Sequence, residues 1–244
     1  MRLCIIPARG GSKRIPRKNV KSFCGQAIIG YSIKSALASQ CFDQVIVSTD
    51  DTEIAEVAKS FGATVPFVRP DALANDYTAT LPVINHAIEW FDNQGQSPTE
   101  VCCLYATAPF VSAGAIRMAY DQMQSMQADY CFTTTSFSFP IQRAIKITAE
   151  NRIEMFYPEH FETRSQDLEE SYHDAGQFYW GKAKAFKQQK PVFSKSATPY
   201  ILPRHLVQDI DTPEDWKRAE LMYQVLMKTA KFDKVRGTHV TRDV

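Results

Sequence analysis

A cluster of basic residues directly follows the first apolar segment of the 244-residue chain. Residues 3–6 (LCII) form a short apolar run, and the adjacent glycines Gly10 and Gly11 come soon after it. The basic residues of this stretch are Arg9, Lys13, Arg14, Arg17 and Lys18. Glycine lets backbone N–H groups approach an anion closely, and cationic side chains supply the compensating charge. The stretch therefore predicts a phosphate-binding loop at the carboxyl end of a buried strand, where open α/β sheets bind ligands.

Two common phosphate-binding motifs do not occur in this loop. Neither G-x-x-x-x-G-K-[ST] nor G-x-G-x-x-G fits, because the two glycines are adjacent and are followed by Ser12 and Lys13. On composition alone, a basic loop that only faces solvent is the alternative interpretation.

Two aspartates near the end of the chain, Asp209 and Asp211, are separated by one residue, Ile210. On an extended segment, side chains two residues apart point to the same side, so both carboxylates would face one spot. Two like charges this close need a cation or a shared proton. An oxygen-only pair suits Mg²⁺, which keeps several waters and bridges to substrate phosphates. In the alternative interpretation, Asp209 caps a turn and Asp211 caps the last helix.

The elements that must position these residues follow from the spacing of apolar residues. Helices are expected over residues 27–39, 54–61, 80–91, 113–126 and 182–189, and a last helix is expected from Thr212, its N-cap. Strands or extended pieces are expected over residues 3–6, 44–48, 64–68, 101–105, 129–135 and 175–180. Strands that alternate with helices predict an α/β fold with a mainly parallel sheet and right-handed crossovers.

The length and the element pattern predict one domain over residues 1–228, followed by a polar tail over residues 229–244. Between residues 137 and 172 the pattern changes, and two short strands around a turn at Glu150–Asn151 predict an excursion from the sheet. No internal repeat is present.

Composition narrows the class of protein. The formal net charge of +1 argues against a general nucleic-acid binder. No apolar run approaches the roughly 20 residues that span a bilayer, and residues 1–20 do not have the pattern of a signal peptide. The six cysteines form no C-x-x-C pair and are expected to be reduced thiols in a cytoplasmic protein.

The stretch PARGGSKRIPRKN resembles the N-terminal signature of the CMP-sugar synthetases, and DIDTPEDW is similar to their C-terminal metal-binding motif. These enzymes are the cytidylyltransferases that activate nine-carbon and related acidic sugars. The resemblance covers nearly all of residues 1–226 and implies a three-layer, Rossmann-like and GT-A-like nucleotidyltransferase domain. It also implies a homodimer in which the 137–172 excursion crosses onto the partner and completes its sugar site.

The resemblance assigns roles to residues at both ends of the chain. It makes Asp209 and Asp211 Mg²⁺ ligands, with Arg9, Lys18 and Asp211 as the catalytic residues. The nucleotide-binding residues that it implies are Ala8, Arg9, Gly10, Ser12, Lys13, Lys18, Asn19, Arg69 and Thr80, the last two at positions that recognise cytosine. Without this resemblance, the alternative interpretation is that Arg69 is a surface residue before a turn and that Thr80 caps the following helix.

A second block separates this chain from the sialic acid branch of the family. TRSQDLEE-YHDAGQFYWG and FPIQRA are similar to the pseudaminic acid branch, whereas the sialic acid branch usually has Pro-Asn-Gly before its tyrosine-bearing strand. The sugar-facing residues that the resemblance implies are Tyr105, Arg143, Arg164 and Gln177. An arginine suits bidentate capture of the sugar carboxylate. The alternative for these arginines is a salt bridge with the acidic run 167–170.

The implied reaction is CTP + pseudaminic acid → CMP-pseudaminic acid + pyrophosphate, with Mg²⁺ as cofactor and no nucleic acid or membrane partner. Within the same class, the alternative substrates are N-acetylneuraminic acid, legionaminic acid and 3-deoxy-manno-octulosonic acid. Two other classes of protein are also open: a glycosyltransferase that uses Asp-x-Asp to bind a nucleotide sugar, and a nucleotide-binding module without catalysis. The strongly basic loop argues against the glycosyltransferase, because a diphosphate donor does not require a triphosphate site.

Overall fold

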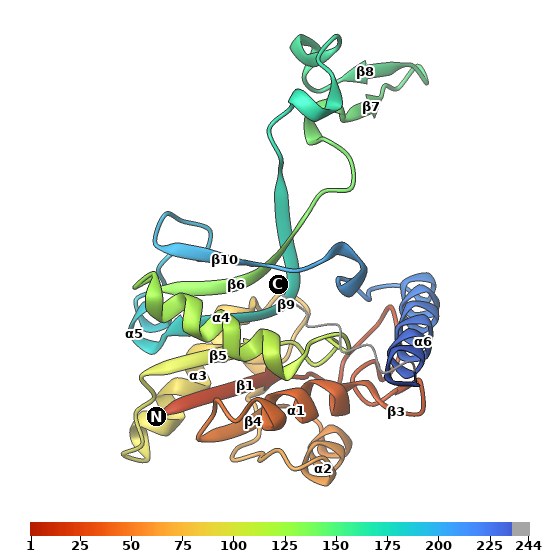
Figure 1. Cartoon of the computed structure of the whole chain (residues 1–244). Coiled ribbons are helices and arrows are strands. Elements are labelled where there is room, and N and C mark those ends of the chain that lie inside the picture. The colour runs from red at the N-terminus through yellow and green to blue at the C-terminus, as the bar shows by residue number, and fades with distance from the viewer. Residues whose placement is uncertain (236–244) are drawn as a thin grey trace.

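The computed structural model describes residues 1–235 and is built on a six-stranded sheet (Figure 1). The strand order is β10-β6-β9-β5-β1-β4, and every strand is parallel to the others except β9. The strands are β1 (Arg2–Pro7), β4 (Gln44–Ser48), β5 (Glu100–Leu104), β6 (Tyr130–Ser136), β9 (Tyr172–Lys182) and β10 (Ala197–Ile201). The expected mainly parallel sheet is confirmed.

Helices cover both faces of the sheet, which gives three layers. The helices are α1 (Ile28–Ser39), α2 (Thr52–Ser60), α3 (Thr80–Asn93), α4 (Ala113–Ser125), α5 (Ala183–Lys187) and α6 (Pro213–Val235). On β1, Cys4 and Ile6 pack in one core with α1, α2 and α4, whereas Leu3 and Ile5 pack in a second core with α3 and α5. Burial on both faces explains why the central strands are continuous apolar runs.

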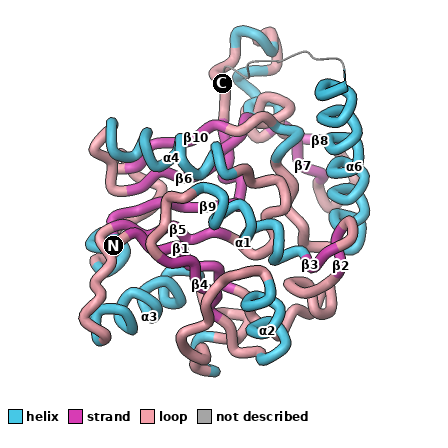
Figure 2. The backbone as a smooth tube through the Cα atoms, turned by 60° about the horizontal axis from the view of Figure 1, so that its bottom comes forward, coloured by secondary structure: helices cyan, strands magenta, loops and turns pink. Residues whose placement is uncertain are grey.

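Helix α6 stands at one end of the sheet, beside the small hairpin of β2 (Ser22–Phe23) and β3 (Gln26–Ala27) (Figures 1 and 2). A third core joins Phe23 to Ile210 and Trp216, so the segment that contains both aspartates is fixed between the hairpin and α6. The expected N-cap is confirmed: the Asp215 N–H donates to Thr212 Oγ1 (3.2 Å), and the Thr212 N–H donates to Asp215 Oδ2 (2.9 Å). This reciprocal capping box leaves the Asp211 carboxylate free of a capping role.

The structure differs from the expected elements in three places. Residues 64–68 make only two isolated bridges, Ile46–Thr64 and Thr49–Val68, and do not form a strand. The edge strand β10 was not expected, since its sequence ATPYI contains a proline and does not alternate cleanly. Helix α6 continues to Val235, so the first part of the predicted tail 229–244 is helical, and residues 236–244 lie outside the described residues.

Residues 137–171, called the arm below, connect β6 to β9 and project away from the sheet (Figure 1). The arm contains the antiparallel pair β7 (Ile145–Ile147) and β8 (Ile153–Met155), joined by a turn that includes Glu150 and Asn151. The two short strands expected in this excursion are therefore confirmed. Their side chains are mostly exposed within one chain.

All six cysteines are free, and five of them are buried. Between residues 1 and 235, no helix is both long and apolar enough to cross a bilayer.

Candidate active site

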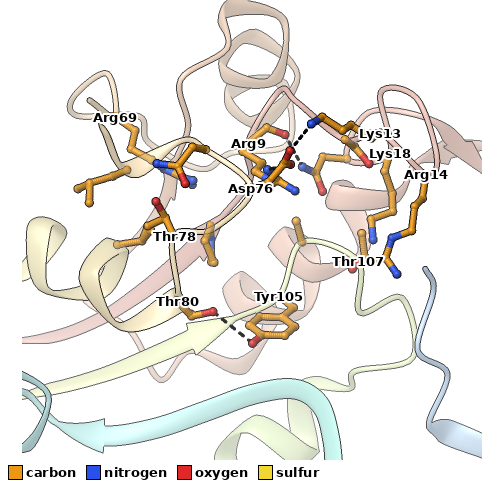
Figure 3. A pocket seen from close by; sticks show the side chains of 17 residues that line it. Arg9, Lys13, Arg14, Lys18, Arg69, Asp76, Thr78, Thr80, Tyr105 and Thr107 are labelled. Carbon is orange, nitrogen blue, oxygen red and sulfur yellow. Dashed lines mark hydrogen bonds and ion pairs between the residues drawn. The ribbon is translucent and has the colours of Figure 1, made fainter. Parts of the chain in front are cut away.

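A cavity of about 500 Å³ opens where β1 and β5 end (Figure 3). It is lined by residues from the basic loop, from the segment between Arg69 and Val83, and from the turn after β5. The lining residues are Pro7, Arg9, Ser12, Lys13, Arg14, Lys18, Asn19, Arg69, Leu73, Asn75, Asp76, Thr78, Thr80, Val83, Tyr105, Ala106 and Thr107. The structure thus brings most of the predicted nucleotide-binding residues to one cavity, at the edge of the sheet where α/β folds bind ligands.

Backbone contacts with the end of β4 position the beginning of the basic loop. The N–H of Ala8, which is itself buried, donates to the Ser48 carbonyl (2.9 Å), and the N–H of Gly10 donates to Asp50 Oδ1 (3.0 Å). A Cβ atom at Gly10 would come within 2.7 Å of Asp51 Oδ2, so a larger residue there would displace the Asp51 side chain. Asn19 closes the loop, because its side-chain amide donates to the Arg9 carbonyl (2.9 Å).

Arg17 is the one basic residue of the loop that does not line the cavity. Its backbone has φ = 56°, and its guanidinium pairs with Asp51 (2.5 and 2.9 Å) and with Glu53 at the start of α2. The pairing with Arg17 lowers the pKa of Asp51 to about 2 and raises the pKa of Arg17. Sequence reasoning grouped Arg17 with the phosphate-binding residues, but the structure makes it the anchor that fixes the loop to α2.

Replacing Asp51 with asparagine should lower the melting temperature at neutral pH by about 2–4 °C, because the pair with Arg17 is lost. The folded-state pKa of Asp51 lies below its ordinary value. The pair therefore stabilises the protein fully above about pH 5, and this contribution declines as the pH falls from about 4 towards 2. The difference in melting temperature between wild type and Asp51→Asn should shrink over that range.

Thermal unfolding followed by circular dichroism between about pH 7 and about pH 3 measures this difference. Glu56→Gln is the matched control, because Glu56 lies on the same helix and makes only an exposed pair with Lys59. A melting-temperature difference for Asp51→Asn that stays constant with pH would contradict the assigned ion pair.

The segment that carries Asp209 and Asp211 meets the basic loop at Lys18 and Arg14. Lys18 Nζ donates to the Ile210 carbonyl (2.8 Å) and lies 3.3 Å from Asp211 Oδ1, while Arg14 Nη1 lies 3.0 Å from Asp211 Oδ2. Ile210 is 2% exposed, and both aspartates remain accessible, as the alternating pattern requires. Partial shielding of the Asp209 carboxyl from water, together with the charge of Asp211, raises the pKa of Asp209.

Arg69 and Thr80 contribute to the opposite wall of the cavity (Figure 3). Arg69 is 4% exposed; its Nε donates to Ser48 Oγ (3.1 Å) and its Nη2 to the Ser48 carbonyl. Burial lowers the pKa of Arg69 to about 10, which leaves it charged at neutral pH.

Thr80 is the first residue of α3 and follows the N-cap Ala79, and its Oγ1 lies 3.4 Å from the Tyr105 hydroxyl. The interpretations of Arg69 as a surface residue and of Thr80 as a helix cap are therefore wrong.

A second cavity, of about 310 Å³, adjoins the first and shares Thr80 and Tyr105 with it. Its other lining residues are Leu81, Ile84, Asp174, Tyr179, Phe186, Val192 and Phe193. The Tyr179 hydroxyl donates to Asp174 Oδ2, and burial raises the pKa of both Tyr105 and Tyr179. Both phenols therefore stay protonated at neutral pH, so this cavity combines an apolar wall with a small polar group.

The four predicted sugar-facing residues are not brought together within one chain. Tyr105 lines both cavities, whereas Arg143 and Arg164 lie in the arm and line neither. Arg164 pairs with Asp167 (2.7 and 3.1 Å), as the salt-bridge alternative describes, and Arg143 donates to the Thr163 carbonyl.

Gln177 also lines neither cavity and is 3% exposed. Its side-chain amide nitrogen donates to the Leu206 carbonyl (2.6 Å), and its backbone carbonyl accepts from the Tyr105 N–H (2.8 Å). Gln177 therefore holds the chain that leads to Asp209, a role that no local pattern predicted.

Sequence reasoning did not identify Asp76, Asp174, Tyr179 or Phe193 as residues of the site. Asp174 and Tyr179 lie in the block YHDAGQFYW, which was noted only for its likeness to one branch of the family. That block is the one sequence signal that could have located them. Asp76 and Phe193 lie in segments without a recognisable motif.

Comparisons with known proteins identify the family of this chain. A sequence profile of the family described as cytidylyltransferase matches residues 3–232. The pseudaminic acid cytidylyltransferase of Campylobacter jejuni subsp. jejuni serotype O:2 is 46% identical over 228 residues, which cover 93% of this chain and 98% of that protein. The CMP-N,N'-diacetyllegionaminic acid synthase of Legionella pneumophila is 30% identical over 230 residues, covering 91% and 96% of the two chains.

Among solved structures, a CMP:2-keto-3-deoxy-manno-octonic acid synthetase complexed with CTP superimposes with a TM-score of 0.66. The match covers 91% of this chain and 98% of that chain at 16% identity, so it supports the fold alone. The three-layer fold, the cationic cavity and the two relatives are all consistent with one class of enzyme. The chain is a nucleotidyltransferase and belongs to the cytidylyltransferase family.

Proposed function

We propose that this enzyme transfers CMP from CTP to pseudaminic acid and releases pyrophosphate. The observation that carries the proposal is the cavity at the ends of β1 and β5, in which five cationic side chains surround a space next to a mainly apolar second cavity. The 46% identity to a pseudaminic acid cytidylyltransferase over nearly the whole chain supports the choice of sugar. The anomeric hydroxyl of the sugar attacks the α-phosphate in line, and pyrophosphate is the leaving group.

Most of the catalysis assigned to this chain is positioning and charge neutralisation. Arg9, Lys13 and Lys18 would contact the triphosphate from the basic loop. Arg69 and Thr80 would face the cytosine from the opposite wall, with the guanidinium and the hydroxyl as hydrogen-bonding groups. The buried Arg69 is held by Ser48, so its orientation is fixed before the base binds.

The residues present fit a bound Mg²⁺ at Asp209 and Asp211. Within residues 1–235, no group of three or more His, Cys, Asp or Glu side chains could hold a metal ion by itself. Two carboxylates that face a phosphate-binding loop suit Mg²⁺, because it completes its coordination with waters and substrate phosphate oxygens. When bound, the metal would supply charge stabilisation at the reacting phosphate. Lys18 and Arg14 hold Asp211 in place on the loop side.

The second cavity is the proposed position of the sugar. Its apolar wall, which includes Val192 and Phe193, suits acyl or methyl groups, and the polar edge formed by Asp174 and Tyr179 suits sugar hydroxyl or amide groups. Because this cavity joins the larger one at Tyr105, a sugar bound there would lie beside the nucleotide.

We also propose a homodimer, in which the arm of one copy reaches the sugar site of the other. Arg143 and Arg164 lie in the arm and line neither of the two cavities described above, although an acidic sugar calls for a cation near its carboxylate. A second copy would bring these arginines to the site. The free cysteines are in keeping with a cytoplasmic reaction, where CTP is available.

Pyrophosphate release in the presence of CTP and Mg²⁺ tests the proposed function. The panel consists of pseudaminic acid, legionaminic acid, N-acetylneuraminic acid and 3-deoxy-manno-octulosonic acid. We expect release with pseudaminic acid and little or none with the other three. Release with another sugar alone would keep the nucleotide site and reject the assigned substrate. Protein that binds CTP but releases no pyrophosphate with any of the four would favour a sugar transferase or a binding module.

A further inference from the structure

Asp76 is the one acidic residue among the side chains that line the larger cavity in the described part of the chain. Its carboxylate lies between two cations of the basic loop: Oδ1 is 2.5 Å from Arg9 Nη1, and Oδ2 contacts Lys13 Nζ (Figure 3). The residue comes from the segment that connects Arg69 to α3, far from the basic loop in sequence. A phosphate group that contacts both cations must therefore compete with this carboxylate.

Four of the five cations of the cavity, all from the basic loop, are divided between two carboxylates. Arg14 and Lys18 face Asp211, while Arg9 and Lys13 face Asp76. The proposed function gives Asp211 a task as a metal ligand, but it gives none to Asp76. Lys13 and Arg9 lower the pKa of Asp76, so the competing group is fully charged at neutral pH.

Asp76 lies in a segment that no helix or strand constrains. After the short 3₁₀ turn Asp71–Leu73, residues 74–79 form no helix or strand before α3 begins at Thr80. Asn75 ties this segment only to itself, through its side-chain amide and the Ala72 carbonyl (2.9 Å). The Asp76 side chain is 30% exposed, so its carboxylate can turn towards solvent when a phosphate takes its place.

We propose that Asp76 is an intramolecular competitor of the phosphate groups and sets how tightly the site holds triphosphate and pyrophosphate. The inference rests on the proposed function and deepens it. When the Asp76 carboxylate returns to Arg9 and Lys13, it would lower the affinity of the site for the product pyrophosphate. The product would then be released more readily. Asp76 acts on the affinity of the two cations for phosphate and takes no part in bond making.

The competition has a specific consequence for ligand choice. Only a ligand whose phosphates reach both Arg9 and Lys13 must displace Asp76. Pyrophosphate and the β- and γ-phosphates of CTP would lie between these two cations, whereas the single phosphate of CMP corresponds to the α-phosphate of CTP. Removing the charge of Asp76 should therefore change the affinity for CTP and pyrophosphate and leave the affinity for CMP unchanged.

Isothermal titration of CTP, pyrophosphate and CMP into the full chain with Mg²⁺ and without sugar tests the inference. We expect Asp76→Asn to bind CTP and pyrophosphate about threefold to tenfold more tightly than the wild type, with CMP unaffected. Asp71→Asn is the matched control, because it removes the same charge from the same segment and Asp71 makes no ion pair with any described residue. In steady-state assays, pyrophosphate should inhibit Asp76→Asn more strongly than the wild type.

Each other outcome rejects the inference. Weaker binding of CTP to Asp76→Asn would mean that Asp76 orients the two cations for the phosphates. Equal tightening in Asp76→Asn and Asp71→Asn would mean that only net charge matters. A wild-type protein that binds neither CTP nor pyrophosphate would reject the proposed function together with the inference, whereas normal CTP binding with no effect of Asp76→Asn rejects the inference alone.

Discussion

Replacement of Asp211 by asparagine is expected to lower kcat for CMP transfer by about two to three orders of magnitude. The Asp211 carboxylate contacts Lys18 and Arg14 and is the proposed Mg²⁺ ligand nearest the basic loop. An amide keeps the shape of the side chain but loses the negative charge that both the cations and the metal require. The fold should survive, because Thr212 and Asp215 cap α6 and the Asp211 side chain is about one-third exposed.

Turnover measured over a range of Mg²⁺ concentrations checks this expectation. Circular dichroism and a thermal melt confirm that the variant is folded. Glu214→Gln is the control, because Glu214 is an exposed acid only three residues away and should tolerate the change. Near-normal turnover of Asp211→Asn at ordinary Mg²⁺ concentrations would remove Asp211 from the set of metal ligands.

The central part of the fold was predictable because its strands are buried on both faces. Residues 3–6 and 101–104 are short, wholly apolar runs, residues 45–47 are a shorter one, and each run is buried and ends in a segment with polar or small residues. Such runs between amphipathic helices specify a parallel sheet with few alternatives. Strand β10 gives no such signal, because its sequence contains Pro199 and only one of its five residues is buried.

The site was predictable only in its local parts. The basic loop and the Asp-x-Asp pair are visible because their members are close in sequence, and family resemblance added Arg69 and Thr80. The contact between Asp76 and Arg9 joins residues 67 positions apart, and no spacing rule reports it. Likewise, five basic residues in one loop look alike in sequence, and only the position of Asp51 separates the anchor Arg17 from the other four.

The arm presents an apolar face that a single chain does not cover. In the β7–β8 pair, Ile147 lies opposite Ile153 and Ile145 lies opposite Met155, so these four side chains share one face. The opposite face has the ion pair between Lys146 and Glu154 (2.8 Å). Ile147 and Ile153 are 72% and 70% exposed. A two-stranded hairpin with an exposed apolar face is marginally stable alone, so this face calls for a second surface.

Ile147→Asp is therefore expected to weaken the proposed homodimer by about a hundredfold or more, since symmetry places the new charge in the interface twice. Sedimentation at micromolar concentration should show a dimer for the wild type and a monomer for the variant. CTP affinity should be retained, because the cavity at the ends of β1 and β5 belongs to one chain. The value of kcat/KM for the sugar should fall steeply, because Arg143 and Arg164 would no longer reach the partner's sugar site.

Leu221→Asp is the matched control for this experiment, because Leu221 is an apolar residue of α6 that is 56% exposed on a different part of the chain. If Leu221→Asp dissociates the dimer and Ile147→Asp does not, the interface lies on α6. If Ile147→Asp yields a monomer with an unchanged KM for the sugar, the arm serves assembly alone, and the arginines of the arm have no part in the site. If the arm is shared between two copies, Ile147→Asp should lose both the dimer and the affinity for the sugar. Its CTP binding should stay intact.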